Sequence, residues 1–435
     1  MLKPQWRAVL FFLLILCFGV LIFGGYMIKK EKPPIPEKVI SPDGVVLFTG
    51  DDIIKGQNYY FSRGGHHIGT IWGHGSYLAP DWSADYLHRA GLFVAARFTG
   101  LNADESAAFS QEYFDKLDAV KKAELTALVT KEMKENRYDA VQKVLTFTAY
   151  QAEAFEHLKK YYTNLFTQGN DRMGLQPGIV TGEHEGHIVT SFFAWLAWAA
   201  GTNRPGQAVT YTTNWPYDPL VGNTPVAEAV VWSIVSVVLL ILALGMVLFF
   251  YNRYMKEEDY TASLAKLDEP EPSSSQKATV IYFFVAMLLF ILQIATGSLT
   301  GHFTVEGTKF FGLDIATILP YALVRTWHIQ LAIFWIATCF LATGLFVGPY
   351  VGKEPKHQGK LVLALFAAVV VVVVGTLAGS WLSIQGYFGG EGFLFGHQGY
   401  EYIELGRVWQ LLLIVGMIIW LVLVLRAIAP ALKSE

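Results

Sequence analysis

Six long apolar segments constrain the fold of this chain more than any other feature of its sequence. They cover residues 8–28, 226–251, 278–298, 318–348, 360–385 and 408–428. A helix needs roughly 20 apolar residues to cross a bilayer core of about 30 Å, so each segment is long enough to do so. With 53% of its 435 residues hydrophobic and only 16% charged, the chain is too apolar for an ordinary soluble protein. We therefore predict a multi-span α-helical membrane protein with about six transmembrane helices.

The basic residues between these segments predict which loops face the cytoplasm. The first segment has lysine or arginine at both ends, so charge alone leaves its orientation open. It ends without a small-residue cleavage site, which indicates an uncleaved anchor. Basic residues recur in 252–277 and 349–359, which the positive-inside rule assigns to the cytoplasm. Residues 30–225, 299–317 and 386–405 are therefore predicted to lie on the outer side of the membrane.

This pattern divides the chain into four predicted parts. Residues 1–29 form an N-terminal anchor, 30–225 a large outer domain, 226–277 a linking transmembrane helix with a polar cytoplasmic linker, and 278–435 a membrane core. Within the outer domain, residues 104–168 are rich in Ala, Leu, Lys and Glu at helical spacing and are predicted to be helical. The net charge of −3, without a basic block, argues against nucleic acid as a partner.

The segment Gly56–Asp85 contains RGGHH where a cytochrome c domain would carry its haem-attachment motif. That motif, C-x-x-C-H, needs two thiols and a histidine. The only cysteines of the chain are Cys17 and Cys339, which lie far apart in two apolar segments. The sequence therefore predicts that neither a covalent haem nor a disulfide forms.

Together with WGHGSYLAPDWSADYLHR, RGGHH resembles the N-terminal domain of quinol-dependent nitric oxide reductases of the haem–copper oxidase superfamily. In that family the cytochrome c subunit is fused to the membrane subunit and has lost its haem. The resemblance implies that residues 30–225 form an extracytoplasmic cytochrome c-like domain without haem, and that 278–435 are the first four helices of a haem–copper oxidase-like core. It also implies a location in a bacterial or archaeal cytoplasmic (inner) membrane, and a lipid-soluble quinol as the electron donor.

His328, in the fourth apolar segment, is the sharpest candidate for a cofactor ligand. An ionisable side chain at membrane depth is costly without a partner. An imidazole can find one either in haem iron or in a hydrogen bond to a neighbouring helix. The resemblance implies the first role, as one of two axial ligands of a low-spin haem b. Arg325, one turn nearer the outer face, would then pair with a haem propionate.

His302 and Glu306 lie four residues apart, just beyond the third apolar segment. A helix would place both on one face, but the surrounding Gly, Thr and Val residues are equally typical of a turn. Two solvated polar residues in a loop would also explain the pattern. The resemblance instead implies a quinol site, in which the pair accepts the hydroxyl protons. An apolar slot for the quinol would be lined by Phe303, Phe310 and Phe311.

Glu401 and Glu404 form a carboxylate pair at the outer end of the sixth apolar segment. Negative charge at a helix N-terminus is favourable by itself. In the family that the sequence resembles, the first glutamate of this motif binds a structural calcium ion and the second lies near the catalytic pocket. Main-chain carbonyls of a glycine and a tyrosine complete that calcium site, and the corresponding residues here are Gly75 and Tyr77. Oxygen donors of this kind suit calcium.

The remaining histidines give weaker signals. His184 and His187 in EHEGH are three residues apart, whereas the zinc motif H-E-x-x-H needs four, so this string is predicted to be the solvated start of a helix. Four histidines of the outer domain are interpreted as structural, because the domain holds no metal of its own in the family: His66, His67, His74 and His88.

The resemblance implies a reaction that needs more than these residues. In the family, nitric oxide is reduced to nitrous oxide at a high-spin haem and a non-haem iron, and the iron is held by three histidines and a glutamate of later helices. After His328 the sequence offers only His357 and His397, both in predicted loops. We therefore expect the N-terminal part of such an enzyme, inactive without C-terminal catalytic helices or a chain that supplies them. The alternative is a non-catalytic haem- or quinone-binding membrane subunit that assembles with a separate catalytic chain.

Overall fold

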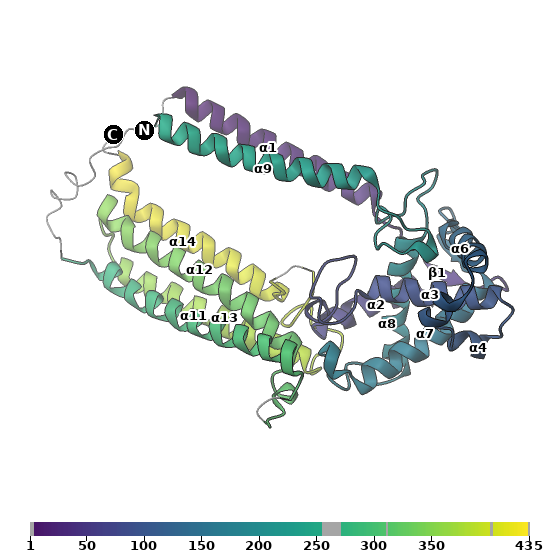
Figure 1. Ribbon diagram of the computed structural model, residues 1–435. Coiled ribbons are helices and arrows are strands. Elements are labelled where there is room, and N and C mark those ends of the chain that lie inside the picture. Colours follow the sequence, from purple (N-terminus) through teal and green to yellow (C-terminus); the bar gives the residue numbers. More distant parts are fainter. Residues whose placement is uncertain (1–3, 255–270, 310–311, 401–402, 434–435) are drawn as a thin grey trace. The chain divides into compact units, whose positions relative to one another are not determined.

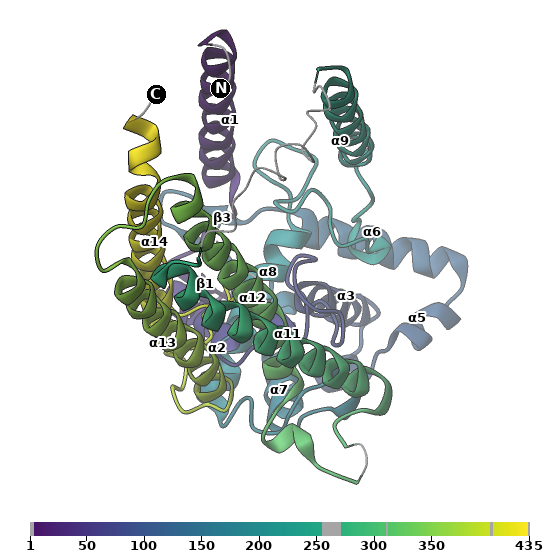
Figure 2. The same cartoon turned by 90° about the vertical axis from the view of Figure 1, so that its left-hand side faces the viewer.

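The computed structural model describes residues 4–254, 271–309, 312–400 and 403–433. Glu401, Phe310, Phe311 and most of the predicted cytoplasmic linker lie outside these ranges. The described chain is mostly helical (Figures 1 and 2).

Contacts divide the chain into two compact units that do not follow the order of the sequence. The first unit comprises Met1–Gly50, Leu87–Ala154 and Trp195–Val226. The second comprises Asp51–Tyr86, Phe155–Ala194 and Ala227–Glu435. Two segments of the predicted outer domain therefore pack with the same unit as the later membrane helices.

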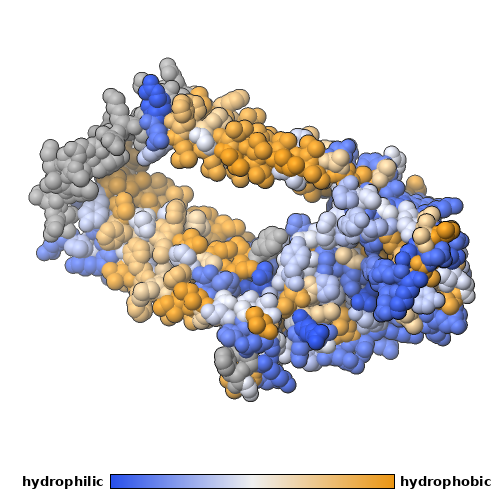
Figure 3. Space-filling view, in the orientation of Figure 1, coloured by the Kyte–Doolittle hydropathy of each residue, from blue (hydrophilic) through white to orange (hydrophobic). Residues whose placement is uncertain are grey.

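Six described helices are long and apolar enough to cross a membrane, which confirms the number predicted from the sequence. Apolar residues cover the surfaces of these helices in Figure 3. The third helix departs most from its predicted bounds, because it continues to Glu306 instead of ending near residue 298. The six are α1 (Pro4–Glu31), α9 (Ala227–Tyr254), α11 (Ser274–Glu306), α12 (Tyr321–Val351), α13 (Gln358–Ile384) and α14 (Arg407–Lys433).

In the second unit, α11, α12, α13 and α14 pack against one another as a bundle. Small residues let the helices approach closely, as expected where van der Waals packing drives helix association. At Gly344 of α12, for example, a Cβ atom would lie 2.7 Å from the ring of Trp420 in α14. Two apolar clusters fill the bundle: Tyr282, Ala342, Leu345, Val362, Leu365 and Leu423 in one, and Leu289, Leu331, Phe334, Val373 and Leu405 in the other.

The RGGHH segment begins where α2 (Gly50–Ser62) ends, and its two glycines explain the tight turn there. Gly64 has a φ of +74°, and a Cβ atom on it would lie 2.9 Å from the Cβ of Ala322 in α12. At Gly65 a Cβ atom would come within 2.3 Å of the Tyr60 ring, whose hydroxyl donates to the Gly65 carbonyl over 2.8 Å. The short 3-10 helix η1 (Gly65–His67) is thereby held in contact with α12.

Aromatic packing holds the outer segments of the second unit together. Trp82, the first residue of α3 (Trp82–Phe98), stacks on Phe193 of α8 (Glu183–Gly201) with ring centroids 5.6 Å apart. Tyr60 and Tyr162 of α7 (Ala149–Gln168) meet Phe193 edge-on. Helix α8 starts at Glu183, so the EHEGH string is a helix start, as predicted.

The first unit contains a small sheet that the sequence did not predict. Its strand order is β2-β1-β4-β3. β1 pairs antiparallel with β2 and parallel with β4, and β3 pairs antiparallel with β4. The strands are β1 (Lys38–Ile40), β2 (Val46–Thr49), β3 (Tyr138–Asp139) and β4 (Val144–Thr146).

The helical prediction for residues 104–168 is correct for most of that range and wrong for β3 and β4. Lys143 turns the chain between these strands with a φ of 53°, and β4 then pairs with β1, about a hundred residues earlier in the sequence. Strand formation here depends on a distant partner, which local helical spacing cannot reveal. The helices of this range are α4 (Ala103–Ala107), α5 (Gln111–Lys116), α6 (Ala119–Lys134) and α7.

Candidate functional site

His328 projects from α12 toward α11, where one of its ring nitrogens is already occupied. Its Nδ1 lies 2.9 Å from the main-chain carbonyl oxygen of Gln293. Because a carbonyl only accepts, Nδ1 carries a proton, and in the neutral ring the free lone pair is that of Nε2. Gly297 makes room for the ring, since a Cβ atom there would lie 2.7 Å from Cε1 of His328. A metal-ligating histidine usually has this arrangement, with the second nitrogen donating to a carbonyl.

Arg325 lies one turn before His328 on α12 and is partly buried. Its Nε is buried and has no hydrogen-bond partner among the described residues. A buried guanidinium donor without an acceptor favours an anionic ligand. His328 and Arg325 therefore fit a haem b, the imidazole for its iron and the guanidinium for a propionate.

His302 and Glu306 both lie on α11, so the helical alternative for this pair is correct. His302 Nδ1 is 3.5 Å from Glu306 Oε2, and the two side chains are 39% and 43% exposed. The pair is therefore accessible to a ligand from outside the bundle. Phe303 is buried and packs edge-on against Tyr321, with ring centroids 6.0 Å apart, so it belongs to the core next to the pair.

The predicted calcium residues are described only in part. Gly75 has a φ of +130°, and a Cβ atom on it would lie 2.7 Å from the carbonyl oxygen of His66. Tyr77 is exposed, and its hydroxyl donates to the carbonyl of Gly73. Glu401 lies outside the described residues, so the calcium site stays a prediction.

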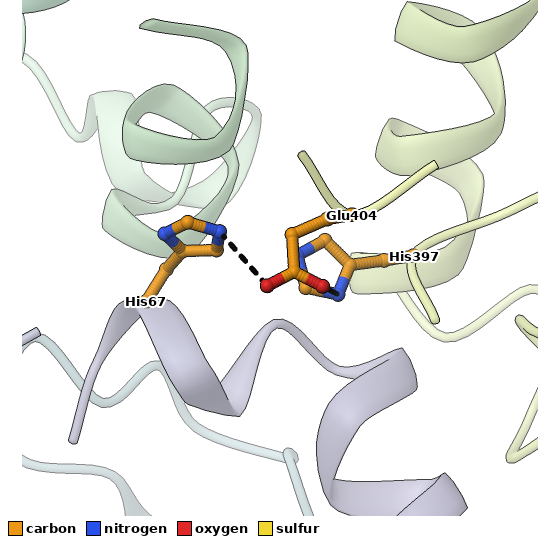
Figure 4. A group of neighbouring side chains, drawn as sticks. All are labelled: His67, His397 and Glu404. Carbon is orange, nitrogen blue, oxygen red and sulfur yellow. Dashed lines mark ion pairs between the residues drawn. The ribbon is translucent and has the colours of Figure 1, made fainter. Parts of the chain in front are cut away.

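Three side chains from distant parts of the sequence converge in the second unit: His67, His397 and Glu404 (Figure 4). His67 belongs to η1, and the other two precede α14. His67 Nε2 lies 3.5 Å from Glu404 Oε1, and His397 Nδ1 lies 3.8 Å from Glu404 Oε2. All three residues are at most 3% exposed. We call this group the His–His–Glu cluster.

Burial shifts the pKa values of both imidazoles in the cluster. Burial lowers the pKa of His67 well below its ordinary value, and the nearby His397, Arg325 and His66 lower it further. Burial also lowers the pKa of His397, although Glu404 opposes that shift. Both imidazoles are therefore neutral at pH 7. Neither carboxylate oxygen of Glu404 has a hydrogen bond within the described part of the chain, and neither does His67 Nε2.

The surrounding chain fixes the orientation of the cluster residues. His397 Nδ1 lies 2.7 Å from the carbonyl oxygen of Phe61, and its Nε2 lies 3.2 Å from Oγ1 of Thr326. Glu404 has a φ of 58°, a left-handed conformation that costs a non-glycine residue about 1 kcal/mol or more. Strain of this kind is concentrated at functional sites, because the surrounding structure must impose it.

Two other histidines lie near carboxylates. His88 Nδ1 lies 3.0 Å from Asp218 Oδ2, and His187 Nε2 lies 3.8 Å from Asp52 Oδ2. His184 is exposed near the start of α8. Cys17 and Cys339 are free cysteines.

Comparison with known proteins gives a match for each of the two large parts of the chain. Residues 36–217 match the family of cytochrome c-like domains found in nitric oxide reductase. Residues 277–435 match the family described as cytochrome c and quinol oxidase polypeptide I. The chain therefore joins a part similar to the cytochrome c-like domain of nitric oxide reductase to a part similar to the haem–copper oxidase membrane subunit. It is thus related to membrane oxidoreductases of the nitric oxide reductase type.

One relative supports the same relationship over a shorter stretch. A nitric oxide reductase chain of Stutzerimonas stutzeri is 31% identical over 107 residues, which cover 24% of this chain. The matched stretch spans 22% of that relative, about a fifth of its length.

Sequence reasoning about the cytochrome c-like domain missed the His–His–Glu cluster. His67 is interpreted as structural and His397 as a loop residue; the structure has His397 in a loop, and it buries both side chains next to Glu404. The available signal was local: two histidines follow the glycines of RGGHH, and His397 stands seven residues before Glu404. Only the fold brings these two parts of the chain together.

Proposed function

We propose that this chain is the N-terminal part of a quinol-dependent nitric oxide reductase. The observation that carries the proposal is that residues 36–217 match a cytochrome c-like domain and contain no cysteine. Without thiols the domain cannot hold a covalent haem, so it offers no relay to a soluble electron donor. A quinol dissolved in the lipid bilayer can instead deliver electrons directly to the membrane helices.

His302 and Glu306 are the proposed acceptors of the quinol protons. Oxidation of a quinol releases two protons, and each needs a base within hydrogen-bond reach. The two side chains lie on one face of α11, are partly exposed, and are close enough to share one ligand. His302 would take one proton at a ring nitrogen and Glu306 the other at its carboxylate.

His328 and Arg325 would hold haem b beside that site. A haem b bound there supplies a one-electron relay. His328 would ligate through Nε2, while its Nδ1 stays fixed to the Gln293 carbonyl. Arg325 would neutralise a propionate through the guanidinium, whose Nε lacks a partner among the described residues. The high-spin haem, the non-haem iron and the reduction of nitric oxide to nitrous oxide would be supplied by further helices or by a separate chain.

We further propose that the cytochrome c-like domain faces the outer side of a bacterial or archaeal inner membrane. The positive-inside rule supports this orientation through the basic residues of 252–277 and 349–359. Glu401, Gly75 and Tyr77 would hold a structural calcium ion on the same side, as carboxylate and carbonyl oxygens suit that ion.

The electron donor is the property to test. Membranes that contain the complete assembly should consume nitric oxide when supplied with a reduced quinol, and should not do so with a reduced soluble cytochrome c. A denaturing gel of the chain should show no covalently bound haem. Turnover with cytochrome c but not with quinol would disprove the proposed donor. Quinol binding without nitric oxide consumption would instead favour a non-catalytic quinone-binding subunit.

A further inference from the structure

The carboxylate of the His–His–Glu cluster is buried and has no hydrogen-bond partner among the described residues. Glu404 is 1% exposed, and neither of its carboxylate oxygens accepts a hydrogen bond within the described residues. A buried carboxylate is normally paired, hydrogen-bonded or bound to a metal ion, because removing it from water is costly. Three ring nitrogens lie near this carboxylate, that of His67 at 3.5 Å and those of His66 and His397 at 3.8 Å each, all beyond hydrogen-bond distance.

We propose that His67, His397 and Glu404 bind a divalent transition-metal ion of the zinc type. The inference is independent of the proposed nitric oxide reductase activity. Two histidines and one glutamate form a ligand set found in open zinc sites, where water takes the fourth position.

The spacing of the donor atoms fits one ion. One donor atom from each residue lies within 4.8 Å of the others. A tetrahedral ion with bonds of about 2.0–2.2 Å separates its ligand atoms by roughly 3.3–3.6 Å. The observed 3.5 Å and 3.8 Å between Glu404 and the two imidazoles are close to these values. Figure 4 shows the three side chains close together, so an ion between them would require the His397 ring to turn from the Phe61 carbonyl toward Glu404.

Thr326 is placed to support a metal-bound His397. The Nδ1 of His397 donates to the Phe61 carbonyl over 2.7 Å, so an ion at Nδ1 would replace this hydrogen bond and the ring would turn away from that oxygen. The proton would then lie on Nε2 and be donated to Thr326 Oγ1, which lies 3.2 Å from Nε2. The Thr326 hydroxyl can accept it, because it donates its own proton to the Ala322 carbonyl over 2.7 Å.

The donor set separates this site from a calcium site. Calcium takes six to eight oxygen ligands, whereas imidazole nitrogen suits zinc and related ions. The site also has a structural consequence, because it would join η1 of the haem-free cytochrome c-like domain to the chain that precedes α14. His67 is the fifth residue of RGGHH, the place of the histidine in C-x-x-C-H, so the ion would be held by the residue that stands where a haem ligand would be.

Metal analysis of the tag-free protein, purified with any chains that accompany it, tests the proposal. After removal of free metal, about one zinc ion per chain should remain. In chelator-treated protein, added Co2+ should give the visible absorption of a tetrahedral site. His67→Ala, His397→Ala and Glu404→Gln should each weaken Co2+ binding about a hundredfold or more, beyond the tenfold to hundredfold typical of residues that only support a ligand. His184→Ala removes an exposed histidine and should bind as the wild type does.

Two further measurements keep the test decisive. Thr326→Val keeps the shape but removes the acceptor for Nε2–H, so it should weaken Co2+ binding about tenfold and alter the Co2+ spectrum. A chelator should lower the melting temperature of the wild type and of His184→Ala, but not that of the ligand variants. The proposal is overturned if the wild type binds no zinc or Co2+, or if the three ligand variants bind Co2+ as tightly as His184→Ala does, which would indicate an adventitious ion only.

Discussion

Helix α12 contributes to two histidine sites that differ in how their polar atoms are satisfied. On one side, His328 has Nδ1 fixed by the Gln293 carbonyl and Nε2 left for a single ligand. Two residues earlier, and roughly 200° around the helix, Thr326 contacts His397 in the His–His–Glu cluster. There Glu404 has two buried oxygens without a hydrogen bond among the described residues. As proposed above, the first site would bind a ligand through one nitrogen, whereas the second would bind a positive ion among several donors.

Replacing His328 tests the proposed haem b site and should have the largest effect. In the complete assembly, His328→Ala should abolish the low-spin haem b spectrum and quinol-driven nitric oxide reduction, because the proposed haem ligand is removed. Zinc or Co2+ binding at the His–His–Glu cluster should be unchanged. Absorption spectra of the reduced and oxidised protein measure the first effect, and metal analysis measures the second. A full low-spin spectrum in the variant would show that another residue is the ligand.

The two sites also differ in how far the sequence could predict them. His328 lies with Arg325 in an apolar segment, and an ionisable side chain at membrane depth is enough to make it a candidate from the sequence. The partner of its Nδ1 is a main-chain carbonyl of another helix, which no residue type specifies. The cluster depends on contacts between residues about 330 positions apart, and loop histidines carry no such information. The six spans follow from local composition. Strand β4, like the cluster, depends on a partner far away in the sequence, which local patterns do not reveal.

The quinol site gives the next largest expected effect. Glu306→Gln keeps the shape of the side chain but removes the base, so quinol-driven turnover should fall about a hundredfold. Reduction of haem b by an artificial donor that bypasses the quinol should be unaffected, because His328 and its Gln293 contact are unchanged. Comparing the two electron sources in the same membranes measures this difference.

Both outcomes that contradict the quinol assignment can be recognised. Equal loss with quinol and with the artificial donor would place the damage in the haem site or in the fold. No loss with either donor would show that His302 and Glu306 are only a solvated pair on α11.

Gly65 of RGGHH allows the His–His–Glu cluster to be tested through the thermal stability of the protein. Gly65→Ala places a Cβ atom within 2.3 Å of the Tyr60 ring, which must move or displace η1. Overpacking of this kind should cost about 2 kcal/mol of stability, and it should weaken metal binding by shifting His67 while leaving the haem b spectrum intact. Thermal unfolding in detergent measures the loss. Gly416→Ala is the control, because a Cβ atom there meets nothing within 4 Å.

Two glycines on α11 test how the imidazole of His328 is positioned, and their replacement has the smallest expected effect. At Gly297 a Cβ atom would lie 2.7 Å from Cε1 of His328, whereas at Gly301, one turn later, it would meet nothing within 4 Å. Gly297→Ala should therefore tilt the imidazole, disturb its bond to the Gln293 carbonyl, and lower quinol-driven turnover about tenfold with a shifted haem b potential. Gly301→Ala makes the same helical substitution without the contact and should change neither. Equal behaviour of the two variants would mean that the ring is not held where α11 and α12 meet, and that its carbonyl partner does not orient it.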